Sequence, residues 1–158
     1  MKRIAIQGEL GSFHDIAAHQ YFEGEQIELI CCATFEGVFE NIKRDPTVVG
    51  ICAIENTIAG SLLHNYELLR KSGTTVVGEH KLHIGHSICC LPDDDWSSLQ
   101  EVHSHPVALM QCGKFLANHP DLKAVEAEDT AGSAAYIAQH KVHGWAAICS
   151  AYAATCMA

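Results

Sequence analysis

The first part of the chain alternates between short apolar runs and segments whose apolar residues recur at helical spacing. Short runs between turn residues are typical of strands, and apolar positions one helical turn apart are typical of amphipathic helices. The pattern predicts alternating strands and helices at residues 2–7, 12–22, 27–32, 34–44, 48–54 and 61–71. Because strands that alternate with helices form parallel sheets with right-handed crossovers, this part is predicted to be an α/β lobe.

The same rhythm returns after an extended stretch. Residues 74–91 are rich in Val, Ile and His and contain Gly78 and Gly85, which indicates an extended connection into a second lobe. Beyond it, strands and helices are predicted to alternate again, at residues 101–104, 106–118, 123–127, 130–139, 146–149 and 150–157. We therefore expect an α/β fold with mainly parallel sheets, in two lobes at residues 1–78 and 79–158 with a cleft between them.

Composition and charge exclude several classes of function. The 158 residues are 48% hydrophobic, and ten Lys and Arg against a net charge of −9 offer no basic stripe for nucleic acid. No apolar run reaches the length of a membrane span, and the N-terminus lacks the pattern of a signal peptide. We therefore expect a cytoplasmic protein that binds neither nucleic acid nor membrane. In that compartment its eight cysteines are expected to be reduced and structural.

Residues 102–112 combine a strand end, a polar turn and a helix start. Ser104 or His105 can cap a helix whose first turn holds Pro106, where a missing N–H costs nothing. This arrangement directs backbone N–H groups, a hydroxyl and an imidazole to one point before a helix. Such a point binds anions, so a carboxylate or phosphate is expected there.

A second polar cluster follows the apolar run at residues 48–54. It contains Glu55, Asn56 and Thr57, followed by Gly60 and Ser61. In an open α/β sheet, ligands bind beyond the carboxyl ends of the strands, which is where this cluster is expected.

Together these segments resemble the catalytic domain of prephenate dehydratases. The family pattern contains E-N-[ST]-x-x-G-S, S-H-P-x-A-L-x-Q-C, T-A before a helix, an N-terminal G-x-x-G-[ST]-F, and a histidine after the strand that links the lobes. The matching residues are Glu55-Asn56-Thr57 with Gly60-Ser61, Ser104-His105-Pro106 with Ala108-Leu109 and Gln111-Cys112, Thr130-Ala131, Gly8, Gly11, Ser12 and Phe13, and His86.

The resemblance implies a two-lobed fold like that of type II periplasmic solute-binding proteins, with the site in the cleft. It also implies the decarboxylative dehydration of prephenate to phenylpyruvate in phenylalanine biosynthesis, without a metal or organic cofactor, by a homodimer or higher homo-oligomer. The expected catalytic residues are Glu55, Asn56 and His105, and the expected substrate-binding residues are Thr57, Ser104, Gln111, Thr130 and Ala131.

Residue chemistry suggests roles for several of these side chains. Glu55 can orient a donor, or donate a proton if burial keeps it protonated, and His105 can act as an acid or as a charge complement. The hydroxyl of Thr130 and the N–H of Ala131 can bind one substrate carboxylate, and Ser104 the other. The structural alternatives are a plain helix cap for Ser104 and Thr130, and an ordinary turn residue for Glu55 and His105.

Three histidines could suggest a metal site instead. On a strand, His80 and His86 share one face while His83 points to the other, so the three cannot meet at one ion without distortion. We therefore expect no metal site.

The sequence also departs from the family pattern. Asp129 replaces the usual serine before Thr130, and it is expected to point into its own helix because it would otherwise repel a substrate carboxylate. The family's T-R-F element, whose threonine is the favoured general acid and whose arginine helps to bind the anion, has no match here, nor does the regulatory domain. We therefore expect a piece of a longer protein that is inactive or nearly so by itself. The alternatives are an arogenate dehydratase and a non-catalytic two-lobed module that binds a small carboxylate.

Overall fold

The computed structural model describes residues 1–156, which fall into two compact units. The first unit comprises Met1–Glu9 and Phe13–His83, and the second comprises Leu10–Ser12 and the chain from Ile84 onward. The chain passes into the second unit for the last time after His83, within the connection at residues 74–91, whereas the predicted boundary lies after residue 78. Each unit has its own sheet and its own hydrophobic core.

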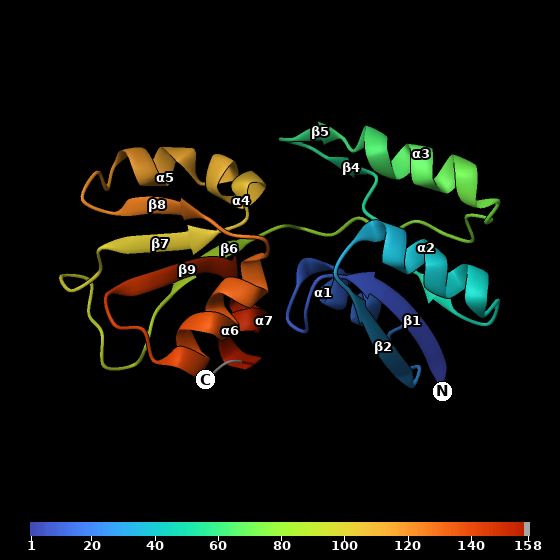
Figure 1. Cartoon of the computed structure of the whole chain (residues 1–158), viewed down its shortest axis with the longest axis horizontal. Coiled ribbons are helices and arrows are strands. Elements are labelled where there is room, and N and C mark those ends of the chain that lie inside the picture. Colours follow the sequence, from blue (N-terminus) through green and yellow to red (C-terminus); the bar gives the residue numbers. More distant parts are fainter. Residues whose placement is uncertain (157–158) are drawn as a thin grey trace. The chain divides into compact units, whose positions relative to one another are not determined.

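The first unit contains a three-stranded parallel sheet in the order β2-β1-β3. It also contains a small antiparallel hairpin, β4-β5 (Figure 1). Its elements are β1 (Lys2–Gln7), α1 (Phe13–Tyr21), β2 (Ile27–Cys32), α2 (Phe35–Arg44), β3 (Val49–Gly50), β4 (Glu55–Asn56), β5 (Gly60–Ser61) and α3 (Leu63–Ser72).

Strand β1 forms the centre of the first unit because helices cover both of its faces. Ile4 and Ile6 pack with Ala18 of α1, while Ala5 packs with Val38 of α2 on the other face. Burial on both faces explains why the strand reads as a continuous apolar run.

The predicted strand at residues 48–54 is wrong for most of its length, since only Val49–Gly50 belongs to the sheet. Beyond Ile51, whose N–H donates to Ala5, the backbone finds other partners. The carbonyl of Ile54 accepts from the N–H of Leu62, and that of Ala53 accepts from the Asn65 side chain. The start of α3 therefore draws this segment out of the sheet.

The second unit contains a four-stranded sheet in the order β6-β9-β7-β8. Strands β7 and β9 and strands β7 and β8 run parallel, whereas β6 runs antiparallel to β9. The elements are β6 (His86–Cys89), β7 (Glu101–Ser104), α4 (Pro106–Gln111), α5 (Gly113–Ala117), β8 (Lys123–Glu126), α6 (Thr130–His140), β9 (Trp145–Ser150) and α7 (Ala151–Cys156).

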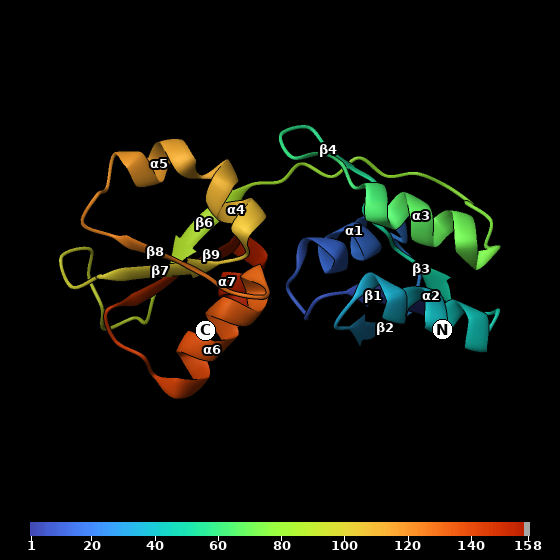
Figure 2. The same cartoon turned by 45° about the horizontal axis from the view of Figure 1, so that its top comes forward.

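Helices also cover both faces of this second sheet. Ala146 and Ile148 of β9 face Ala108 and Leu109 of α4, whereas the alternate residues of the strand face α6 and α7 (Figure 2). This alternation is the two-residue period of a strand placed between two helical layers.

Two sequence expectations for the second unit are wrong. The helix predicted at residues 106–118 is two helices, because the backbone leaves the helical conformation at Cys112 (φ −90°, ψ 9°). Residues 86–89, predicted only as part of an extended connection, form β6. The last predicted helix is present to Cys156, and its predicted end at residue 157 lies outside the described residues.

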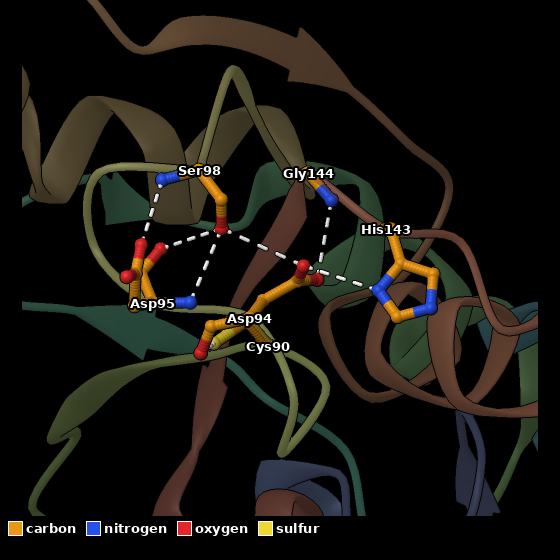
Figure 3. Close-up of polar contacts among 6 residues, drawn as sticks. All are labelled: Cys90, Asp94, Asp95, Ser98, His143 and Gly144. Atoms are coloured by element: carbon orange, nitrogen blue, oxygen red, sulfur yellow. Dashed lines mark hydrogen bonds and ion pairs between the residues drawn. The ribbon is translucent and has the colours of Figure 1, made fainter.

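A buried carboxylate fixes the turn before β9 (Figure 3). The side chain of Asp94 is 6% exposed and accepts hydrogen bonds from the backbone N–H of Gly144 and from His143 Nδ1, both at 3.1 Å. Ser98 Oγ lies 3.5 Å from the same carboxylate. Asp94 thus ties the loop after β6 to the beginning of β9.

Over residues 1–156, no helix has the length and the apolar character needed to cross a membrane.

Candidate active site

The E-N-T-x-x-G-S motif forms the β4-β5 hairpin of the first unit. Asn56 lies opposite Gly60, and its Oδ1 accepts hydrogen bonds from the N–H groups of Ile58 and Ala59, each at 2.9 Å. An asparagine that bonds its own turn in this way closes a tight loop. Asn56 therefore uses its oxygen for the turn, and a role as a donor falls to its amide nitrogen. Thr57 lies exposed at the tip.

Glu55 begins this hairpin and is exposed. The burial that would keep Glu55 protonated is therefore absent. Its Oε1 accepts a hydrogen bond from the Tyr66 hydroxyl of α3 at 3.1 Å. Partial desolvation, and then the hydrogen bond to Glu55 and its charge, raise the pKa of Tyr66 above its ordinary value.

Tyr66 and the neighbouring Asn65 belong to no motif, and sequence reasoning missed both residues. The available signal was positional: they lie in the first turn of the helix that directly follows the motif.

The S-H-P motif forms the junction of β7 and α4 in the second unit. His105 is the N-cap, with extended backbone (φ −60°, ψ 141°), and its Nδ1 accepts from the N–H of Val107 at 3.2 Å. Of the two candidate caps, His105 therefore caps the helix. Because Nδ1 accepts, this bond assigns the proton of a neutral imidazole to Nε2.

Ser104 is fully buried at the end of β7. Its hydroxyl donates to the carbonyl of Ile148 in β9 at 2.5 Å. The one hydroxyl hydrogen that could bind a substrate carboxylate is thus used between two strands.

Gln111 lies at the end of α4 and is bonded to β6. Nε2–H of His86 donates to Gln111 Oε1, with 2.6 Å between the two atoms. This bond orients the carboxamide and identifies the amide nitrogen of Gln111 as its donor group.

The T-A motif begins α6, and Asp129 caps this helix. Asp129 Oδ1 accepts from the N–H of Ala131 at 2.8 Å, which confirms that Asp129 points into its own helix. The N–H of Ala131, expected to bind a substrate carboxylate, thus donates to a carboxylate of the protein. Thr130 is the first helical residue and is half-buried.

The N-terminal glycines form a tight turn. Gly8 and Gly11 have φ values of +96° and +87°, in the region that favours glycine. A Cβ on Gly11 would lie 2.9 Å from the Cα of Ala153, and the carbonyl of Gly11 accepts from Ser150 Oγ at 2.8 Å. Close packing of Leu10–Ser12 within the second unit therefore explains the requirement for glycine at position 11.

The cysteines described by the structure are joined by no disulfide. Burial raises the pKa of Cys52 to about 11, and burial followed by the charge of Asp94 raises the pKa of Cys90. At these two positions the raised pKa favours the unreactive thiol, whereas the hydrogen bond with Cys149 lowers the pKa of Cys89.

Two of the three histidines that suggested a metal site, His80 and His86, have other partners. His80 Nε2 lies 2.9 Å from Gln20 Oε1, and His86 bonds Gln111. Within residues 1–156 no group of three His, Cys, Asp or Glu side chains is arranged to hold a metal ion.

Comparison with known proteins identifies the family. A family model described as prephenate dehydratase matches residues 4–158. The chain is 34% identical over 141 residues to a bifunctional chorismate mutase/prephenate dehydratase of Escherichia coli K12, covering 88% of this chain. It is 35% identical over 153 residues to arogenate dehydratase 1 of Petunia hybrida, covering 96% of this chain. It spans 36% of the length of each of these two relatives.

Solved structures show the same fold. A protein described as a novel type of quorum-quenching acylase aligns with a TM-score of 0.84 at 28% identity, over 98% of this chain and 56% of that one. Prephenate dehydratase from Staphylococcus aureus Mu50 aligns with a TM-score of 0.78 at 22% identity, with the same coverages, which supports the fold alone. The predicted fold class, α/β with mainly parallel sheets and periplasmic-binding-protein-like, is confirmed. On the match of the family model from residue 4 to residue 158, the chain belongs to the prephenate dehydratase family.

Proposed function

We propose that this chain binds prephenate and supplies residues for its conversion to phenylpyruvate. The observation that carries the proposal is the family match over residues 4–158, which includes each of the motifs described above. In this reaction the ring carboxylate leaves as carbon dioxide, and its bonding electrons complete the aromatic ring. They expel the ring hydroxyl, which takes up one proton and leaves as water.

The first unit contributes Glu55, Asn56 and Thr57. Asn56 donates through its amide nitrogen, since its oxygen closes the hairpin turn. Thr57 offers an exposed hydroxyl at the hairpin tip for a substrate oxygen. Glu55 is ready to orient a donor, because it already accepts the hydrogen bond of Tyr66.

The second unit contributes donors for the anionic substrate. His105 offers Nε2–H while Nδ1 caps α4, and Gln111 offers its amide nitrogen while His86 holds its oxygen. Thr130 adds a hydroxyl at the start of α6. The Ser104 hydroxyl can bind the substrate only if it gives up its bond to the carbonyl of Ile148. Likewise, the N–H of Ala131 can bind the substrate only if it gives up its bond to Asp129.

The reaction calls for positioned donors and a source of one proton, and we propose no metal or organic cofactor. We further propose a cytoplasmic location and assembly as a homodimer or higher homo-oligomer, as the family resemblance implies.

The test combines calorimetric binding of prephenate with detection of phenylpyruvate. We expect saturable binding, slow product formation, and a marked loss of both in Gln111→Ala. The exposed Gln139→Ala is the matched control. Absence of both binding and product at millimolar prephenate would contradict the proposal. Stoichiometric binding that never yields product would instead indicate a carboxylate-binding module.

Arogenate is the competing substrate, since the relative named arogenate dehydratase is as similar as the one named prephenate dehydratase, at 35% against 34%. Arogenate carries an amine where prephenate carries a keto group. Parallel assays with both compounds decide between them: a higher kcat/KM for arogenate would reassign the substrate.

A further inference from the structure

Three consecutive residues in the first turn of α3 bond two other segments of the first unit. His64 Nε2 lies 2.6 Å from Glu36 Oε1 of α2, and Asn65 Nδ2 donates to the carbonyl of Ala53 at 2.7 Å. Tyr66 donates its hydroxyl hydrogen to Glu55. The start of α3 is thus attached to α2 on one side and to the E-N-T hairpin on the other (Figure 1).

Asn65 makes the base of the hairpin rigid. Its side chain is among the most buried polar groups of the first unit, at 2% exposed. A buried carboxamide that bonds a backbone carbonyl is costly to displace, because water cannot replace the partner. The adjacent bond from the N–H of Leu62 to the carbonyl of Ile54, at 2.9 Å, holds the next residue of the segment.

The backbone of Glu55 is therefore fixed, but its side chain is exposed and long. A glutamate in that position samples several rotamers unless a partner selects one. Tyr66 provides such a partner: its ring has only two side-chain torsions, and its helix is itself anchored. Within residues 1–156, this hydroxyl is the group that bonds the Glu55 carboxylate.

We propose that Tyr66 is a positioning residue of the dehydratase reaction, whose hydroxyl holds the Glu55 carboxylate in the orientation that meets the substrate. The inference rests on the proposed function of Glu55.

The chemistry of the pair also distinguishes between the two roles considered for Glu55. A phenol bonds an ionised carboxylate more strongly than a neutral carboxylic acid. The pair therefore suits a carboxylate that accepts hydrogen bonds and orients a donor, rather than one that gives up a proton.

The first test needs no turnover. The chain has four tyrosines, and their ionisation is followed by tyrosinate absorbance, with Tyr66→Phe identifying the contribution of Tyr66. We expect Glu55→Gln to lower the pKa of Tyr66, because the carboxylate that opposes its ionisation is gone. An unchanged Tyr66 titration in Glu55→Gln would overturn the proposal.

The second test is a double-mutant cycle on kcat and KM. We expect Tyr66→Phe to lower kcat about tenfold, with KM little changed, since it removes one hydrogen bond to a charged group. In the Glu55→Gln background the same substitution should change kcat by less than about twofold, because the group it positions is absent. Equal losses in both backgrounds would show that Tyr66 acts independently of Glu55.

The matched control is Tyr136→Phe in α6, which lies half exposed and stacks on His140 rather than on the hairpin. It should leave kcat and the Glu55-dependent titration unchanged. If wild-type chain neither binds nor converts prephenate, the proposed function fails while the titration still decides the Tyr66–Glu55 contact.

Discussion

Replacing Ser104 with alanine should destabilise the second unit by about 2 kcal/mol, because a bond between two strands is lost inside the protein. The hydroxyl of Ser104 is 0% exposed and donates to the carbonyl of Ile148. A typical hydrogen bond contributes about 0.5–1.5 kcal/mol net, and a buried acceptor left without its donor costs about 1–3 kcal/mol.

The position of this bond favours a loss of stability near the middle of the range for an unpaired buried acceptor, about 2 kcal/mol. The ladder between β7 and β9 ends at His103 and Ala147, so the Ser104 bond continues the connection by one residue. Ile148 is 2% exposed, so water has little access to its carbonyl once the Ser104 hydroxyl has been removed. Alanine fills most of the space of serine, so cavity formation adds little.

Urea unfolding followed by tryptophan fluorescence measures this effect, because both tryptophans, Trp96 and Trp145, lie in the second unit. The expected loss corresponds to about 4–8 °C in melting temperature for a chain of this size. Ser97→Ala, at an exposed position, is the matched control and should unfold like the wild type. A Ser104→Ala variant as stable as this control would refute the reasoning. A weaker affinity for prephenate in the fully folded variant would show a substrate role as well.

Three further predictions follow from local contacts. Asp129→Ala should lower the free energy of unfolding by about 1 kcal/mol, because α6 loses its N-cap, and urea unfolding measures this loss. Asp129→Asn should retain most of that stability, because asparagine is also a good N-cap residue. The pKa of Glu67 is lowered from 4.5 to about 2, chiefly by the hydrogen bond from Arg70, so its contribution to stability is present above about pH 4.5 and lost as pH falls towards 2. Melting temperatures of Glu67→Gln measured between these pH values should lack the pH-dependent contribution of the Glu67 carboxylate. Added salt should weaken that contribution in the wild type. Iodoacetamide at pH 8 should label half-buried Cys52 far more slowly than exposed Cys31, as read by peptide mass spectrometry, and equal labelling would contradict the raised pKa of Cys52.

Much of the fold follows from local sequence signals. The strands Ile27–Cys32 and Glu101–Ser104 have the predicted ends. Ile27–Cys32 follows a turn at Gly24, and Glu101–Ser104 ends before the helix that begins at Pro106. Helix α2 begins after Thr34 and ends at Arg44, before Asp45-Pro46, as capping and proline geometry predict. Such elements depend on contacts that lie within a few residues in the sequence.

Two of the failures share a physical cause, since each depends on hydrogen-bond partners outside the segment itself. Strand β6 forms because His86–Cys89 pairs antiparallel with β9, about sixty residues later in the chain. The run at residues 48–54 has the composition of a strand, yet Leu62 and Asn65 capture two of its carbonyl groups. Propensity cannot predict such competition, because tertiary partners decide which hydrogen bonds form.

The candidate site shows the same limit at the level of single atoms. Residue type and spacing select Asn56, Ser104 and His105, but they do not reveal which atoms the fold itself uses. In the structure the Asn56 oxygen closes a turn, the Ser104 hydroxyl joins two strands, and His105 Nδ1 caps a helix. The donors of these side chains are therefore the amide nitrogen of Asn56 and Nε2–H of His105. In a neutral imidazole, the cap at Nδ1 leaves Nε2–H as the donor of His105. The chemistry at this junction is thus limited by the same hydrogen bonds that build it.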